Sequence, residues 1–227
     1  MVSQKRTKIV IVGTGGCGRD ALWTLLACNK NSKKYDILGF LDDDKRLHNK
    51  IICGKKVLGG TEWFSENMAK TTKCIVAIGS GRVRKKIVNE LEKKHVKFVT
   101  VIHPSVIMSE SVKIGKGTII QAGTIISVDV EIGSHCVINM DCTIAHDTKI
   151  NDFVDLNPGV HISGVSKIHT GAFVGSGVTT MATISIGKWS VIGAGSVLIE
   201  DVPDRLACIG NPGRLIKKLA DDYMPYH

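Results

Sequence analysis

The sequence predicts an α/β fold in two parts followed by a short tail. Residues 1–101 combine apolar strand-like runs with glycine-rich turns and helical periodicity, which is typical of a parallel sheet covered by helices. Residues 102–203 repeat a six-residue pattern, which is the signature of a parallel β-helix. Residues 204–227 are expected to form a C-terminal tail with a short helix.

The first part has four strand-like runs. They cover Lys8–Val12, Ile37–Leu41, Cys74–Ile78 and Lys97–Val101. Helices are expected after the first run, through about Asn29, and after the third, over the basic segment Arg82–Lys94. Four strands make one mononucleotide-binding half, so the prediction is a half-Rossmann domain.

Residues that could bind a phosphate or a ribose follow the ends of these strands. Such strand-to-helix turns hold phosphate, because backbone N–H groups and the positive helix end face it and glycine lets it come close. Carboxylates after the second strand lie where a ribose hydroxyl would sit. The predicted substrate-binding residues here are Gly13, Gly15, Gly16, Cys17, Gly18, Asp42, Asp43, Gly79 and Ser80.

Three interpretations of the glycine loop are open. The G-x-G-x-x-G spacing followed by acidic residues matches a nicotinamide site. A single mononucleotide half fits a nucleotide or nucleotide sugar better than a dinucleotide. A purely structural strand-to-helix turn is the third interpretation.

The second part repeats a large aliphatic residue every six positions from Ile102 to Leu198. Only Thr180 breaks the series, and small or β-branched residues such as Val112, Thr124 and Cys136 follow four places later. Three hexads make one triangular coil, whose aliphatic residues stack on those of the next coil to form a continuous core. The seventeen hexads predict nearly six coils.

Composition narrows the class of protein. The seven cysteines are scattered without C-x-x-C pairs, which indicates reduced thiols in a cytoplasmic protein. The formal charge of +9 lacks the aromatic interleaving of a nucleic-acid platform, so no nucleic-acid partner is expected. The apolar start is too short for a membrane span, and no membrane partner is expected.

Several motifs together resemble the sugar O- and N-acyltransferases related to sialic-acid O-acetyltransferase and to bacillosamine and perosamine N-acetyltransferases. They are the glycine loop with Phe40–Asp43, Ile102–Pro104, the hexads, Ile144–Asp147, Asn157–Gly159 and Ile209–Pro212. The resemblance covers almost the whole chain. It implies a left-handed β-helix, a homotrimer with active sites between subunits, acetyl-CoA between neighbouring helices and a nucleotide-linked amino sugar on the N-terminal domain.

His146 is the expected catalytic base. A neutral imidazole suits removal of the proton from an attacking amine near pH 7. The resemblance gives Asp147 the role of orienting that ring, and Asn139 that of contacting the sugar amine. It also implies that a backbone N–H one coil beyond the histidine binds the oxyanion, and that position is Gly164. A surface histidine without a catalytic role is the alternative.

The remaining expected contacts concern acetyl-CoA. Asp155 stands where relatives carry a second histidine near the acetyl group, and Cys17 stands where relatives often have histidine in the glycine loop. The expected cofactor-binding residues are Asp155, Gly164, Gly175, Ala182, Ala194 and Lys188. No metal is expected, because the spacing of the coil histidines does not match the stacking of coils.

The sequence therefore predicts an acetyl-CoA-dependent N-acetyltransferase. Its acceptor is expected to be the 4-amino group of a 4-amino-4,6-dideoxysugar linked to UDP, GDP or dTDP. O-acetylation of a sialic-acid-type sugar is the alternative reaction, and a non-catalytic trimer that binds sugar nucleotides is the alternative class.

Overall fold

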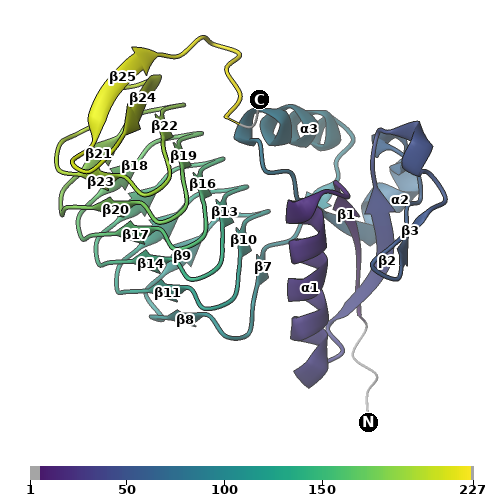
Figure 1. Ribbon diagram of the computed structural model, residues 1–227. Helices are drawn as coiled ribbons and strands as arrows, with labels where there is room; N and C mark the ends of the chain where they lie inside the picture. The colour runs from purple at the N-terminus through teal and green to yellow at the C-terminus, as the bar shows by residue number, and fades with distance from the viewer. Residues whose placement is uncertain (1–5, 226–227) are drawn as a thin grey trace.

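A computed structural model describes residues 6–225, and residues 1–5 and 226–227 of the predicted first domain and tail lie outside the described part. The chain forms a small α/β unit beside a long stack of coils (Figure 1). The stack is a left-handed β-helix, and the predicted fold class is confirmed.

The N-terminal unit is built on a parallel sheet of order β2-β1-β5-β6. The strands are β1 (Thr7–Val12), β2 (Tyr35–Leu41), β5 (Thr72–Val76) and β6 (Lys97–Phe98). The main helices are α1 (Gly16–Asn31) and α3 (Gly81–Lys93). Strand β1 is central and fully buried over Ile9–Val12, which explains its unbroken apolar sequence.

Residues 42–71 contain elements that the periodicity analysis does not predict. They are the hairpin β3 (Ile51–Ile52) and β4 (Lys55–Lys56), the short helix α2 (Glu66–Thr71), and 3-10 turns at Lys45–Leu47 and Thr61–Trp63. Each is too short to display a period of 2 or 3.6 residues.

The β-helix consists of two-residue strands at six-residue intervals, which form three faces. Face 1 contains β7 (Val101–Ile102), β10 (Ile119–Ile120), β13 (Val137–Ile138), β16 (Asp155–Leu156), β19 (Phe173–Val174) and β22 (Val191–Ile192). Face 2 contains β8 (Ile107–Met108), β11 (Ile125–Ile126), β14 (Thr143–Ile144), β17 (His161–Ile162), β20 (Thr179–Thr180) and β23 (Val197–Leu198). Face 3 contains β9 (Lys113–Ile114), β12 (Glu131–Ile132), β15 (Lys149–Ile150), β18 (Lys167–Ile168) and β21 (Ser185–Ile186).

The second residue of most of these strands points into the stack. Ile120, Ile138 and Leu156 are fully buried and pair in register along face 1. Thr180, which breaks the hexad series, is also buried, and its hydroxyl accepts a hydrogen bond from the Ser163 N–H at 3.0 Å. The stack therefore tolerates this polar residue at a core position because its hydroxyl has a partner.

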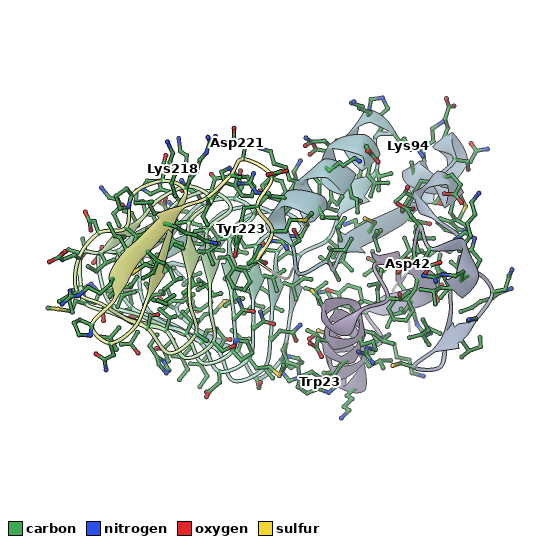
Figure 2. All side chains as sticks on the ribbon, turned by 45° about the horizontal axis from the view of Figure 1, so that its top comes forward. Trp23, Asp42, Lys94, Lys218, Asp221 and Tyr223 are labelled. Carbon is green, nitrogen blue, oxygen red and sulfur yellow. The ribbon has the colours of Figure 1, made fainter. Side chains whose placement is uncertain are left out.

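The predicted short helix of the C-terminal tail is wrong for the described residues 204–225. They contain β24 (Leu206–Ile209) and β25 (Arg214–Lys218), which pair as an antiparallel hairpin. Strand β24 continues face 1 by pairing with β22, and this leaves the backbone of β24 extended. Figure 2 shows the tail running from the hairpin with Lys218 past Asp221 to Tyr223, toward the N-terminal unit.

Candidate active site

The glycine loop between β1 and α1 contains two kinds of glycine. Gly13 has φ of +102°, and a Cβ there would lie 2.7 Å from the Ala77 carbonyl oxygen. A Cβ on Gly18 would overlap the Gly13 carbonyl oxygen. By contrast, a Cβ on Gly15 or Gly16 would meet nothing within 4 Å. Two glycines thus serve the packing of the loop, and two leave open space in front of the helix.

That open space is a cavity of about 510 Å³. The amino end of α1 faces it, and no side chain caps this helix end. The N–H groups of the first helical turn have no intrahelical acceptor, so they are available to an anion. The lining residues from the N-terminal unit are Gly13, Thr14, Gly15, Gly16, Cys17, Asp20, Asp42, Ala77, Ile78, Gly79 and Ser80.

The two acidic residues predicted for the cavity differ in position. Asp42 lines the cavity, and its Oδ2 accepts hydrogen bonds from the N–H and the hydroxyl of Thr14, at 3.1 and 2.6 Å. Asp43 accepts from the N–H of Thr61 at 3.0 Å and is absent from the lining. Asp42 therefore fixes the glycine loop at the cavity, while Asp43 holds the next loop.

The other wall of the cavity comes from face 1 of the β-helix. Val137, Asn139, Asp155 and Asn157 line it. The side-chain amide of Asn139 donates to the Leu156 carbonyl at 3.0 Å, and that of Asn157 donates to the Val174 carbonyl at 2.9 Å. These bonds hold both amides in one orientation, one coil apart.

A buried ion pair joins helix α3 of the N-terminal unit to the cavity wall that the β-helix forms. Arg84 of α3 lies 2.8 Å from Asp155 of β16, with side-chain exposures of 0% and 4%. Arg84 also donates to the carbonyl oxygens of Ile78, His135 and Phe153. Burial raises the pKa of Asp155 to about 6, although the adjacent guanidinium opposes this shift. The pair fixes how the N-terminal unit sits on the β-helix.

His146 and Asp147 lie at the corner between faces 2 and 3. The His146 Nδ1 is 2.8 Å from the Asp147 Oδ2, and both side chains are more than half exposed. With the proton on Nδ1 donated to the carboxylate, Nε2 is left as an acceptor. The corner backbone holds Asp147 at φ of +58°, which directs its side chain back toward the ring.

Gly164 lies directly over the His146 ring, one coil further. A Cβ at Gly164 would be 2.7 Å from the His146 Nε2, so any larger residue would displace the ring. Neighbouring backbone bonds, Val165 N–H to the His146 carbonyl and Thr183 N–H to the Gly164 carbonyl, hold the corners in register. Within residues 6–225 the Gly164 N–H has no hydrogen-bond acceptor, as is usual for this corner position.

Three comparisons with known proteins, by family model, by sequence and by structure, each found similar proteins. The PglD N-terminal domain family matches residues 8–91. UDP-N-acetylbacillosamine N-acetyltransferase of Bacillus subtilis is 36% identical over 119 residues, 48% of this chain and 49% of the relative, so the match spans about half the length of that relative.

Two solved structures are similar over nearly the whole chain. A mutant of perosamine N-acetyltransferase from Caulobacter crescentus, in complex with CoA and GDP-perosamine, has a TM-score of 0.86 and 27% identity, covering 96% of this chain and 100% of that one. The acetyltransferase domain of PglB from Neisseria gonorrhoeae, in complex with acetyl coenzyme A, has a TM-score of 0.84 and 26% identity, covering 93% and 100%. Residues 8–91 thus match one family model, and nearly the whole chain has the fold of these two acetyltransferases.

The two halves of the candidate site lie apart within one chain. The cavity rests on face 1, whereas His146 occupies the corner between faces 2 and 3, which is opposite face 1 in a triangular coil. Neither His146, Asp147 nor Gly164 lines the cavity. One chain therefore brings the predicted substrate-binding residues together, but it does not bring the predicted base to them.

The predicted cofactor-binding residues are spread over the β-helix. Ala182 lies one coil beyond Gly164 at the same corner. Gly175 directly follows β19 of face 1 and lies against the backbone of Ala194 in the next coil. Lys188 lies at the corner between faces 3 and 1, where its N–H donates to Asp204 at 2.6 Å. Asp155 belongs to the cavity wall instead. These assignments stay predictions.

Sequence reasoning missed three residues that shape the cavity. Thr14 anchors Asp42, Asn157 repeats the position of Asn139 one coil later, and Arg84 pins Asp155. Asn157 could have been found from the sequence, because it follows Asn139 by 18 residues, which is one coil. No sequence signal marks the burial of Arg84, because this residue stands among exposed basic residues of the same helix.

Cys17 lines the cavity as a thiol. Burial raises its pKa to about 12, so it is protonated at neutral pH and is not activated as a nucleophile. Among the residues from 6 to 225, no three His, Cys, Asp or Glu side chains gather into a metal-binding group. The same residues include no helix that is long and apolar enough to cross a membrane.

Proposed function

We propose that the chain is an acetyl-CoA-dependent N-acetyltransferase that acetylates the 4-amino group of a nucleotide-linked 4-amino-4,6-dideoxysugar. The observation that carries the proposal is the His146–Asp147 pair beneath Gly164, because an oriented imidazole beside a free N–H suits acyl transfer. The relatives named for perosamine and bacillosamine N-acetylation support the acceptor class.

The acceptor's nucleotide is expected in the cavity of the N-terminal unit. Its diphosphate would face the N–H groups at the start of α1, and a ribose hydroxyl would meet Asp42. Asn139 and Asn157 on the opposite wall would face the sugar.

The reaction follows from the chemistry of a thioester. The amine nitrogen attacks the carbonyl carbon, a C–N bond forms, and the carbonyl electron pair moves onto oxygen. His146 Nε2 accepts the amine proton, Asp147 stabilises the resulting imidazolium, and the Gly164 N–H donates to the oxyanion. Collapse of the tetrahedral intermediate breaks the C–S bond, and the coenzyme A thiolate takes the proton from His146.

Assembly completes the site in this proposal. Because His146 and the cavity lie on opposite sides of one coil, the base must come from a second copy of the chain. A cyclic homotrimer would place the His146 corner of one subunit against face 1 of the next, with acetyl-CoA between the two helices. The scattered free thiols favour a cytoplasmic setting for this reaction.

A substrate screen tests the proposed reaction. Nucleotide-linked 4-amino sugars are mixed with acetyl-CoA and thiol release is followed, with a sialic acid as the comparator. Release with an amino sugar alone is expected, and release with the sialic acid alone would support the O-acetyltransferase instead. Acetyl-CoA that fails to bind in calorimetry would favour a non-catalytic sugar-nucleotide trimer.

The role of His146 is tested in the same assay. His146→Ala is expected to lower kcat by about 100-fold to 10,000-fold, the range for loss of a general base. His169→Ala is the matched control, since that coil histidine lies at a different corner, where its Nε2 is 3.2 Å from the Ser185 hydroxyl. Near-native turnover of His146→Ala would refute the catalytic role.

A further inference from the structure

The two ends of the N-terminal sheet differ in chemistry. The carboxyl ends of β1, β2 and β5 face the cavity, whereas the amino ends of β1, β5 and β6 carry Lys8, Lys73 and Lys97. Strand β1 separates these ends by about 20 Å at 3.3 Å per residue. The basic end is therefore too far away to serve the nucleotide in the cavity.

A hollow of about 270 Å³ opens at this basic end. Exposed cations surround it, and its lining contains no aspartate or glutamate. The lining residues are Arg6, Thr7, Lys8, Ala69, Lys70, Thr71, Thr72, Lys73 and Lys97.

Within the described residues, the five cations have no carboxylate partner. No ion pair joins Arg6, Lys8, Lys70, Lys73 or Lys97 to an acidic residue anywhere in the described chain, 6–225. Lys73 and Lys97 are also paired directly across neighbouring strands, so their charges stand side by side. Like charges in this relation destabilise a sheet, and a bound anion would relieve the repulsion.

A buried hydroxyl gives independent support for a ligand. Thr72 lines the hollow with only 2% of its surface exposed, and its Oγ1 has no hydrogen-bond partner. Lys8 pairs with Thr72 in register, so a lysine lies next to this hydroxyl. An orphaned buried hydroxyl is unfavourable, and rotation of the Thr72 side chain toward an anion in the hollow would give it a partner.

We propose that this hollow is a second anion site, which binds a phosphate group at the amino end of the sheet. Lysine and arginine donate charge-assisted hydrogen bonds to phosphate oxygens, and Thr72 would add a neutral donor. The site is separate from the proposed acetyl-transfer site, and it suits either a small phosphorylated compound or the phosphate of a lipid headgroup.

Calorimetric titration with inorganic phosphate and with pyrophosphate tests the site in the full chain; every protein compared, the wild-type reference included, also carries Gly16→Phe, which fills the cavity before α1 so that only the second site binds the probe. Saturable binding is expected, and the Lys73→Ala/Lys97→Ala variant should weaken it about tenfold or more, because two charge-assisted bonds are lost. The control, Lys33→Ala/Lys86→Ala, removes two exposed charges elsewhere and should bind like the wild type.

Thr72→Val separates a ligand contact from a structural one. It removes the hydroxyl and keeps the shape, so phosphate affinity should fall about fivefold while the unliganded melting temperature stays equal or rises. A lower melting temperature with unchanged affinity would contradict the proposal.

Vesicle sedimentation distinguishes the two sources of phosphate. Binding to phosphatidylcholine vesicles containing phosphatidylglycerol, lost in Lys73→Ala/Lys97→Ala but not in the control, would assign the site to a membrane surface. Binding of free phosphate or pyrophosphate alone would assign it to a soluble compound. Binding of neither probe, or equal binding by the pair variant and the control, would overturn the site.

Discussion

The N-terminal unit and the β-helix bury their apolar side chains in different ways. In the β-helix, each coil repeats the last, and residues such as Ile120, Ile138 and Leu156 contact their equivalents above and below. In the N-terminal unit, single interactions such as Thr14 with Asp42 occur once. The repeat makes stability additive along the stack, whereas the unit depends on individual contacts.

The two regions also differ in charge. Residues 1–101 contain 21 lysines and arginines against 9 acidic residues, while residues 102–227 contain 9 against 12. The whole positive charge of the protein thus comes from the smaller region. In the proposed account, the weakly acidic β-helix carries the catalytic pair at one of its corners, and the basic N-terminal unit binds the anions.

The ion pair between the regions is expected to give the largest effect on stability. Arg84→Ala leaves the buried Asp155 carboxylate without its cation, so the free energy of unfolding should fall by about 3–5 kcal/mol. Chemical denaturation measures this. Lys86→Ala on the same helix is the control and should stay within about 0.5 kcal/mol.

A double variant sharpens the same test. Arg84→Met with Asp155→Leu removes both charges, and its loss of stability should be much smaller than that of Arg84→Ala. If Arg84→Ala were as stable as the wild type, the ion pair would not hold the regions together.

A cavity in the β-helix core is expected to have a slightly smaller and more local effect. Ile138→Ala should lower the free energy of unfolding by about 3 kcal/mol, because a fully buried side chain is truncated. Hydrogen exchange should accelerate in the coils next to Ile138 and not in distant coils. The matched variant in the N-terminal unit, Ile11→Ala, should accelerate hydrogen exchange across its whole sheet. If Ile138→Ala also accelerated exchange along the whole β-helix, the two regions would not differ in how locally they open.

The glycines of the two regions make a third comparison. Gly164→Ala should lower kcat for acetyl transfer about 100-fold, because the new methyl group displaces the His146 ring. Gly15→Ala faces open space and should mainly raise KM for the acceptor. Steady-state kinetics measure both, and equal effects on kcat would contradict the assignment of one glycine to the base and the other to the ligand.

The smallest expected effect is a pH dependence at the junction of the regions. His135 is buried between Phe98 and Phe153 with neither ring nitrogen paired, and desolvation lowers its pKa to about 4. Lys116 also lowers this pKa, and Glu92 opposes the shift. The unfolded chain, with a histidine pKa near 6.5, therefore binds more protons between those values.

The contribution of neutral His135 to the free energy of unfolding is complete above about pH 6.5 and is lost as the pH falls toward 4. His135→Phe removes the effect, so the wild type should lose stability relative to this variant over that range. The raised pKa of Asp155 acts in the opposite sense, since its contribution declines as the pH rises toward 6, but it is common to both proteins. A constant difference between wild type and variant from pH 7 to 4 would contradict the assignment.

Strict periodicity made the β-helix predictable from the sequence. Each hexad from Ile102 to Leu198 corresponds to one strand, and the predicted stacking of Gly164 on His146 follows from the same count. Segments without a period were not predictable. Residues 42–71 and the hairpin of β24 and β25 take their form from pairing partners that are distant in the sequence.

The site was predictable only in part for a similar reason. The glycine loop and Asp42 follow strand ends, so their convergence on one cavity follows from the parallel sheet. The burial of Arg84 and the separation of His146 from the cavity depend on how the two regions dock. The catalytic and binding roles of these residues stay predictions, as do the domain boundaries.

Mixing two inactive variants tests most directly the claim that one chain supplies the cavity and another the base. His146→Ala removes the base, and Gly16→Phe fills the open space before α1. After the subunits are mixed and reassembled, acetyl transfer should reappear at up to about a quarter of the wild-type rate, since that fraction of interfaces in a cyclic oligomer combines two intact halves. No recovery in a mixture that demonstrably exchanges subunits would contradict the account.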